Sequence, residues 1–191
     1  MIGSASFSIG LPDWCQSFAD SLPDRLTDEC DRMGIAIELA RNNVEAASGG
    51  PFGALVTTLD EGCIIAIGVN RVEPECCSSA HAEIVALSLA QKRIGSFNLA
   101  EFDGGPLALY SSCEPCAMCL GAIPWSGIRR LVCGATREDA SETGFDEGER
   151  MADWTAMLER RGISVATGLL RAEAASVLLE YRDRGARIYN P

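Results

Sequence analysis

The sequence predicts an α/β protein of one domain, a three-layer α/β/α sandwich around a mixed sheet of about five strands. Segments with helical periodicity alternate along the chain with short apolar segments typical of strands, the pattern of a sheet covered by helices on both faces. The first two strand segments are joined by a tight turn, which predicts an antiparallel hairpin. The 191 residues, of which 47% are hydrophobic, suffice for one such core.

The first half of the chain supplies a helix, a hairpin and a second helix. Residues 29–47 are expected to be helical, because apolar side chains recur in one stripe from Met33 to Ala47 before the segment Ser48-Gly49-Gly50-Pro51 ends the helix. The segments 54–59 and 63–69 are predicted strands, joined by a turn at 60–62. A second helix is expected at 80–94.

The second half continues the alternation of strands and helices. A third strand is expected at 107–112, and Pro115 is expected to begin a helix that runs to about residue 123, because proline suits the first helical position. The order is completed by a strand at 128–134, a polar surface loop at 136–148, a helix at 149–161, a strand at 163–166 and a helix at 170–184.

Residues 1–28 stand apart from this alternating pattern. They are too apolar for a free tail, and Pro12 and Pro23 interrupt them. We therefore expect an N-terminal arm that packs either on the domain formed by residues 29–191 or on a second subunit.

Composition and charge exclude several functional classes. Lys and Arg number 16 against 27 Asp and Glu, and a formal charge of −11 argues against a nucleic acid as the partner. No apolar segment approaches the roughly 18 residues that span a bilayer, so no membrane partner is expected. The N-terminus lacks the features of a signal peptide, which favours a cytoplasmic protein with reduced cysteines.

One histidine and a pair of cysteines form the pattern with the clearest chemistry. Cys116 and Cys119 are three residues apart at the start of a predicted helix, so they share a face on which the helix dipole favours thiolates. His81 stands at the start of another predicted helix. One nitrogen and two sulfurs can bind Zn²⁺ and leave the fourth position to a water molecule, which then ionises readily. Glu83, two residues from His81, is placed to move that proton as a general acid and base.

A structural zinc site is the alternative interpretation of the same residues. Cys113, Cys116 and Cys119 are each three residues apart, and together with His81 they would form a closed Cys₃His site. The protein would then be a zinc-stabilised interaction module without catalysis, and Glu83 would have no task. The fourth ligand of the metal, a water molecule or Cys113, distinguishes the two hypotheses.

Several spaced blocks of the sequence resemble the zinc-dependent nucleobase and nucleoside deaminases. The signature H-x-E followed by P-C-x-x-C is present, and family blocks occur in family order at Gly50–Ala54, Ala80–Glu83 and Ser112–Ala122. The resemblance covers roughly residues 30–150 and implies that residues 29–191 form a deaminase domain. It also implies that His81, Cys116 and Cys119 bind zinc and that Glu83 is the proton shuttle.

The segment Gly144-Phe145-Asp146-Glu147 narrows the resemblance to bacterial guanine deaminases, which carry G-F-D-D at a similar spacing. A carboxylate can accept hydrogen bonds from the N–H groups on the edge of guanine that is attacked. The resemblance implies Glu147 as the substrate contact, with Asp146 as the alternate. This chain carries Glu where those relatives carry Asp, so its carboxylate reaches one methylene further.

Four further substrate-binding residues are implied by the same resemblance. Asn70 matches a base-binding asparagine, whose amide both donates to and accepts from a ring edge. Phe52 and Trp125 lie in matching blocks, where they would stack on a purine. The similar guanine deaminases are domain-swapped dimers that close the site with their C-terminus, which implies a homodimer with Tyr189 as the closing residue. For Asn70, Trp125 and Tyr189, a purely structural role remains the alternative.

The function implied is the hydrolysis of guanine to xanthine and ammonia by zinc-bound hydroxide, with a side activity on amino-triazines such as ammeline. The tRNA adenosine deaminases share the H-A-E and P-C-x-M-C blocks, but they need a basic surface that a charge of −11 does not offer. Deamination of cytosine or of a nucleoside is a further alternative within the same enzyme class.

Overall fold

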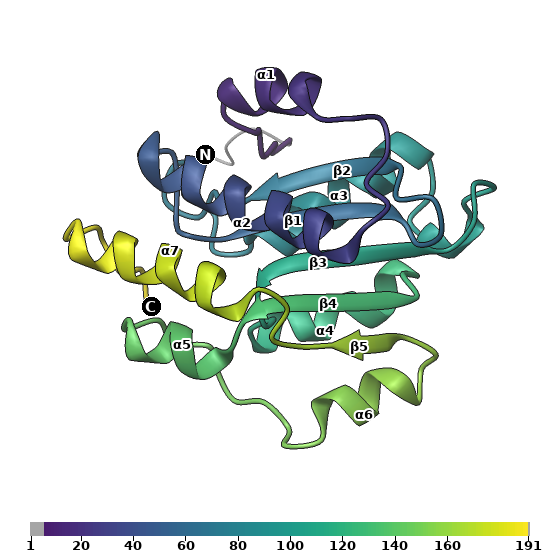
Figure 1. Cartoon of the computed structure of the whole chain (residues 1–191). Coiled ribbons are helices and arrows are strands. Elements are labelled where there is room, and N and C mark those ends of the chain that lie inside the picture. Colours follow the sequence, from purple (N-terminus) through teal and green to yellow (C-terminus); the bar gives the residue numbers. More distant parts are fainter. Residues whose placement is uncertain (1–5, 191) are drawn as a thin grey trace.

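The chain folds around one five-stranded sheet, as the computed structural model in Figure 1 shows for residues 6–190, the part of the chain that is described. The strand order is β2-β1-β3-β4-β5; β1 pairs antiparallel with β2 and β3, and β3, β4 and β5 run parallel. The strands are β1 (Gly53–Thr58), β2 (Ile64–Val69), β3 (Leu107–Cys113), β4 (Arg130–Ala135) and β5 (Ser164–Ala166). The predicted mixed sheet of five strands is confirmed.

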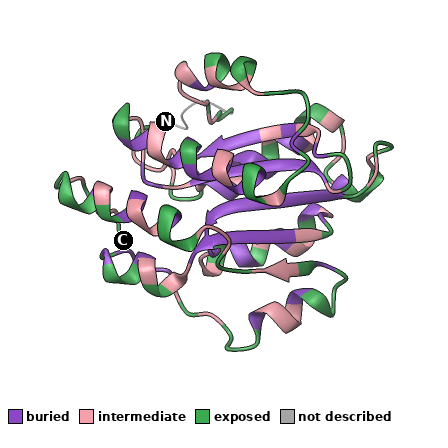
Figure 2. Ribbon diagram, viewed as in Figure 1, coloured by how far each residue is buried: buried purple, intermediate pink, exposed green. Residues whose placement is uncertain are grey.

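Helices cover both faces of this sheet, which confirms the predicted three layers (Figure 1). One layer holds α1 (Trp14–Ser21), α2 (Glu29–Glu45), α5 (Arg137–Glu142) and α7 (Arg171–Asp183), and the other holds α3 (Ala82–Ile94), α4 (Ala117–Ser126) and α6 (Trp154–Glu159). A short 3₁₀ helix spans Leu99–Glu101. Figure 2 shows that the central strands are buried while the outer sides of the helices are exposed, so each layer packs one apolar stripe on the sheet.

Two strand glycines bring helices close to the sheet where the layers meet. A Cβ atom on Gly53 would lie 2.3 Å from the carbonyl oxygen of Ala36 in α2. A Cβ atom on Gly68 would lie 2.3 Å from the carbonyl oxygen of Ala82, the first residue of α3. These glycines therefore let the helix backbones approach the strands, and Gly68 fixes the start of α3 next to the end of β2.

The structure corrects several predicted elements. Helix α4 begins at Ala117 rather than at Pro115, because Cys116 keeps an extended backbone and its sulfur accepts a hydrogen bond from the amide of Cys119 as the N-cap. The predicted loop at 136–148 contains α5, which a capping box formed by Thr136 and Asp139 begins. The helix predicted at 149–161 is shorter, since α6 starts only at Trp154.

The described part of the N-terminal segment packs on the same chain. Cys15 in α1 and Leu26 are buried in the same core cluster as the apolar residues of α2. The indole N–H of Trp14 donates to Ser48 Oγ at 3.0 Å, and Arg25 forms an isolated antiparallel bridge with Cys63. Residues 1–5 of the expected arm lie outside the described residues.

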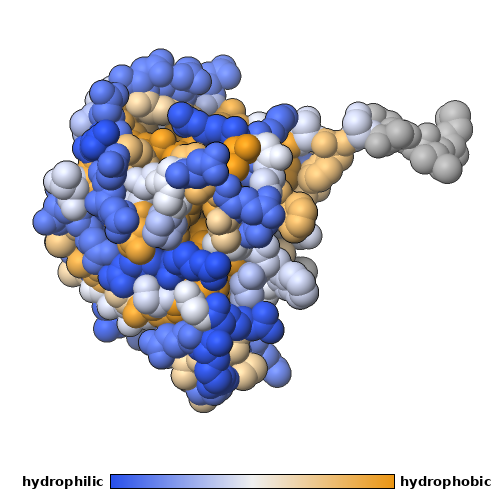
Figure 3. All heavy atoms as spheres, turned by 90° about the vertical axis from the view of Figure 1, so that its right-hand side faces the viewer, coloured by the Kyte–Doolittle hydropathy of each residue, from blue (hydrophilic) through white to orange (hydrophobic). Residues whose placement is uncertain are grey.

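Within residues 6–190, no helix combines the length and apolarity needed to cross a membrane. Figure 3 shows the face seen from the right-hand side of Figure 1, where hydrophilic residues alternate with smaller hydrophobic patches.

Candidate metal centre and active site

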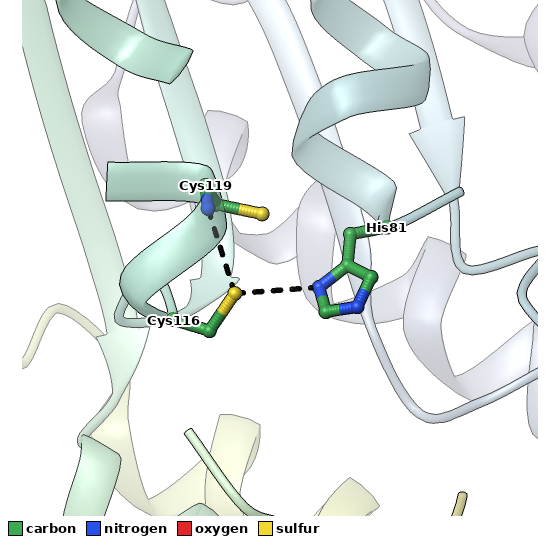
Figure 4. A group of neighbouring side chains, drawn as sticks. All are labelled: His81, Cys116 and Cys119. Atoms are coloured by element: carbon green, nitrogen blue, oxygen red, sulfur yellow. Dashed lines mark hydrogen bonds between the residues drawn. The ribbon is translucent and has the colours of Figure 1, made fainter. Parts of the chain in front are cut away.

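The starts of two helices from one layer bring together the residues of the candidate metal centre. His81 is the N-cap of α3, which follows the loop after β2, and Cys116 is the N-cap of α4, which follows β3. Cys119 lies in the first turn of α4 on the same side as Cys116. Ligand atoms of the three residues lie within 4.8 Å of one another, and their side chains converge as Figure 4 shows.

Hydrogen bonds already favour the charged form of one thiol in this cluster. Cys116 Sγ lies 3.5 Å from His81 Nδ1 and 3.5 Å from the backbone nitrogen of Cys119 (Figure 4). The hydrogen bond with the Cys119 side chain, together with those from His81 and the helix backbone, lowers the pKa of Cys116 to about 4 against the opposing effect of burial. A thiolate at a helix N-terminus is the form of cysteine that binds metal ions.

The set of donor atoms fits a zinc ion with three protein ligands. One imidazole and two thiols suit Zn²⁺, and both His81 and Cys116 line a cavity from which a fourth ligand can approach. Cys113, the residue that would close a structural site, is buried and directs its sulfur to the carbonyl oxygen of Thr136 at 3.6 Å. In the described part of the chain the geometry therefore supports an open site and gives no support to a closed Cys₃His site.

Glu83 lies in the first turn of α3 and faces the same cavity. Its side chain is buried, and burial raises the pKa of this carboxyl, with the charge of Cys116 adding to the effect. A carboxyl group with a raised pKa beside an open metal position is suited to accept and return a proton. The i and i+2 residues His81 and Glu83 reach one pocket because His81 precedes the helix as its cap.

A cavity of about 670 Å³ extends from these residues and has an aromatic wall. The ring centroids of Phe52 and Phe145 are 5.0 Å apart in a T-shaped contact, and those of Phe145 and Tyr189 are 5.3 Å apart. Tyr181 stacks behind Phe145 at 5.9 Å. These rings give the cavity an aromatic surface that a planar ring can contact.

Glu147 and Asp146 occupy different environments although they are adjacent in sequence. Glu147 is 8% exposed and lines the cavity, and burial raises the pKa of its carboxyl to about 8, with the charges of Cys116 and Glu83 adding to the effect. Asp146 is exposed, and its carboxylate accepts a hydrogen bond from the amide of Gly148 at 2.9 Å, so it caps its own turn. Both predicted acids line the cavity, but only Glu147 is buried there.

Asn70 directly follows β2; its side chain is buried, and it is not among the residues that line the cavity. Its Oδ1 accepts hydrogen bonds from the amides of Val72 at 3.2 Å and Gly50 at 3.4 Å. Its Nδ2 is buried and has no hydrogen-bond partner within residues 6–190. The Oδ1 atom thus stabilises the turn around residue 71, while Nδ2 is free to donate a hydrogen bond.

Tyr189 reaches the cavity from the C-terminal segment of the same chain. Its hydroxyl is buried without a partner among the described residues, and a Cβ atom on Gly50 would lie only 2.2 Å from that hydroxyl. Asn190 anchors the segment, since its amide group bonds the carbonyl oxygen of Gly144 at 2.7 Å and the amide of Asp146 at 3.0 Å.

The structure does not bring Trp125 to the cavity. The residue lies on α4 with 79% of its surface exposed, and it is absent from the cavity lining. The expectation that it stacks on the substrate thus has no support, because its ring points outward from the far turn of the helix whose first turn carries Cys116 and Cys119.

Phe145 and Glu114 are among the lining residues that the sequence analysis did not name. Phe145 contacts the rings of Phe52 and Tyr189, and nothing in its own segment indicates these distant partners. Glu114 lines the cavity and is buried, with no signal beyond its place next to Pro115.

Comparisons with known proteins agree with this geometry. The family model for the "cytidine and deoxycytidylate deaminase zinc-binding region" matches residues 26–135. A guanine deaminase of Bacillus subtilis is 43% identical over 112 residues, which are 59% of this chain and 67% of that protein. A tRNA-specific adenosine deaminase of Buchnera aphidicola is 33% identical over 131 residues, 69% of this chain and 79% of that protein. A solved structure of a guanine deaminase from Nitrosomonas europaea has a TM-score of 0.89 and 47% identity, and the match covers 96% of this chain and all of that one.

Proposed function

This chain belongs to the zinc-binding cytidine and deoxycytidylate deaminase family and is a zinc-dependent deaminase, and from that premise we propose that its substrate is free guanine. Hydrolysis would yield xanthine and ammonia. The likeness to two guanine deaminases supports this substrate. Amino-triazines such as ammeline, which present a similar ring edge, are proposed as side substrates.

The observation that carries the choice of guanine is the environment of Glu147. Its buried carboxylate faces the cavity and accepts no hydrogen bond within residues 6–190. Burial without a partner destabilises its charged form, so a ligand with N–H donors would stabilise that form. Guanine carries such donors on the ring edge next to the carbon that loses its amine.

The reaction assigns a task to each group around that carbon. His81, Cys116 and Cys119 would hold the zinc ion, which when bound supplies a water molecule that loses its proton far more readily than bulk water. Glu83 accepts that proton as the oxygen bonds to C2 of guanine. Glu83 then returns the proton to the exocyclic nitrogen, the carbon–nitrogen bond breaks, and ammonia leaves as the carbonyl of xanthine forms.

The other proposed contacts hold the ring. Phe52 and Tyr189 belong to the aromatic wall of the cavity and would contact the faces and edges of a purine. The free Nδ2 of Asn70 would donate to the ring edge once the substrate is bound.

Deamination of adenosine in tRNA is the second candidate, because a tRNA-specific adenosine deaminase is among the relatives. A formal charge of −11 repels a phosphate backbone. The C-terminal segment around Tyr189 also lines the cavity, where an extruded nucleotide would have to enter. Both observations favour a free base over a polynucleotide.

The test is ammonia release from guanine, adenine, cytosine, guanosine, ammeline and a tRNA anticodon stem-loop, each with the zinc-loaded protein. We expect the highest kcat/KM with guanine. Glu83→Gln should retain zinc and reduce kcat by roughly 10²–10⁴-fold, the usual contribution of a general acid and base. Release from cytosine or from the stem-loop without release from guanine would overturn the proposal.

We also propose a homodimer in the cytoplasm. Trp125 and Met118, both on α4, expose 79% and 39% of their surfaces, and a second copy would cover them. All nine cysteines are free thiols, which suits a reducing compartment. We further propose residues 29–191 as the deaminase domain and residues 1–28 as its arm.

A further inference from the structure

A buried ion pair at the edge of the cavity has no part in the chemistry described so far. Arg150 Nη2 donates to Glu114 Oε2 at 2.9 Å, and each side chain is only 9% exposed. Removing two charges from water is costly, and a pair of this kind is weak evidence for stability. Glu114 lines the cavity and Arg150 does not, so the pair lies at the border of the cavity.

The two partners belong to segments with different tasks. Glu114 stands two residues before Cys116, so it is joined to the start of the helix that carries two metal ligands. Arg150 stands three residues after Glu147, in a segment without helix or strand. The ion pair therefore joins the metal-binding side of the cavity to the side that faces the base.

Two further contacts fix the same junction. The amide of Ala117, the first residue of α4, donates to the carbonyl oxygen of Glu147 at 3.0 Å. Glu114 Oε2 also accepts from the backbone N–H of Arg137 at 3.3 Å, while the guanidinium of Arg137 bonds the carbonyl oxygen of Gly148. Residues 147–150 are thus tied to the region around residues 114–117 through both backbone and side chains.

The contacts of Arg150 fix the direction of its guanidinium but leave one of its nitrogens without a hydrogen bond. Its guanidinium lies 4.5 Å from the ring centroid of Trp154, which fixes its plane. Its Nη1 is buried and has no hydrogen-bond partner within residues 6–190. An arginine that leaves one buried nitrogen unpaired but stacks on an indole holds a defined direction toward Glu114.

Building on the proposed function, we propose that Glu114 and Arg150 are positioning residues that set the distance between the Glu147 carboxylate and the metal centre. That distance determines whether the reacting carbon lies over the metal while the ring N–H reaches Glu147. Discrimination between guanine and a purine without that N–H therefore depends on an ion pair that touches neither reacting atom.

The test compares guanine with 2-aminopurine, which carries the same amine but lacks the N1–H donor. Arg150→Met should lower kcat/KM for guanine by about tenfold, mainly through KM, and should lower that for 2-aminopurine by less than threefold. Zinc content should stay at the wild-type value. Arg150→Lys, which keeps the charge, should restore part of the discrimination.

Two further variants keep the test decisive. Arg160→Met is the matched control, because Arg160 forms an exposed ion pair with Asp153. This variant should leave kcat/KM for both substrates unchanged. Glu114→Gln keeps an acceptor for the Arg137 amide and should show a smaller loss in the same direction, which answers the case in which Arg150→Met does not fold.

The outcomes separate this proposal from the proposed function. Equal losses with guanine and 2-aminopurine would assign the ion pair to general stability and overturn the positioning role. Unchanged discrimination in both variants would overturn it as well. A wild-type protein inactive on guanine would overturn the proposed substrate instead, whatever the variants do.

Discussion

The metal-binding side of the cavity and the side that faces the base are held by different kinds of contact. His81 and Cys116 are helix caps, so the backbones of α3 and α4 place them directly. Residues 144–150 form no helix or strand and depend on contacts with Glu114, Arg137 and Asn190, which lie outside this segment. The comparison indicates that the chemistry rests on rigid local structure and the choice of substrate on a network of side chains.

The largest effect is expected from Cys116→Ser, which breaks the metal side alone. Serine is a good N-cap, so α4 should persist while the thiolate ligand is lost. We expect zinc content to fall sharply, with no measurable ammonia release, and unchanged helicity by circular dichroism. Cys30→Ser, at an exposed thiol outside the cavity, is the matched control and should behave as the wild type. A fully active, zinc-loaded Cys116→Ser protein would contradict the assignment of this ligand.

An intermediate effect is expected from Glu147→Gln, which changes the base-facing side alone. A hydrogen bond to a charged group contributes about 1.5–3 kcal/mol, so KM for guanine should rise roughly 10- to 100-fold with zinc content unchanged. Steady-state kinetics and metal analysis measure the two quantities. Asp146→Asn keeps an oxygen that can cap Gly148 and should change KM little, which separates the two adjacent acids. Equal effects of the two substitutions would remove Glu147 from its role.

The smallest effect on catalysis is expected from Trp125→Ser, which belongs to neither side of the cavity. Its exposed ring does not line the cavity, so kcat per chain and KM should stay within about twofold of the wild type. The proposed homodimer should weaken instead, as measured by light scattering over a range of protein concentrations. If the variant keeps the oligomeric state of the wild type but loses guanine binding, Trp125 is a substrate contact after all.

The metal side could be predicted from sequence because its signals are local. Cys116 and Cys119 are neighbours by helical spacing, and His81 and Glu83 share one helix start, so only the meeting of the two helices had to be supplied by the fold. The alternation of helices and strands predicted that fold for the same reason. Even α5, which was missed, carries its signal locally in the capping pair Thr136 and Asp139.

The base-facing side could be predicted only in part. Glu147 was found through its motif, but the Glu114–Arg150 pair joins residues 36 positions apart, and nothing in either segment specifies the other. Trp125 is exposed and does not line the cavity of this chain, because an aromatic residue in a matching block does not reveal which way its side of the helix faces. Phe145 was overlooked because its packing partners, Phe52 and Tyr189, lie far away along the chain.

The sulfur atom of Cys116 has two roles: it caps the N-terminus of α4, and it is a candidate ligand of the metal ion. It accepts a hydrogen bond from the backbone N–H of Cys119, and it also faces the imidazole of His81. Electron density drawn toward a bound cation weakens the sulfur as an acceptor, so ion uptake and the firmness of the first helical turn are coupled. The Cys119 amide is therefore a built-in reporter of occupancy, readable by its exchange with deuterium.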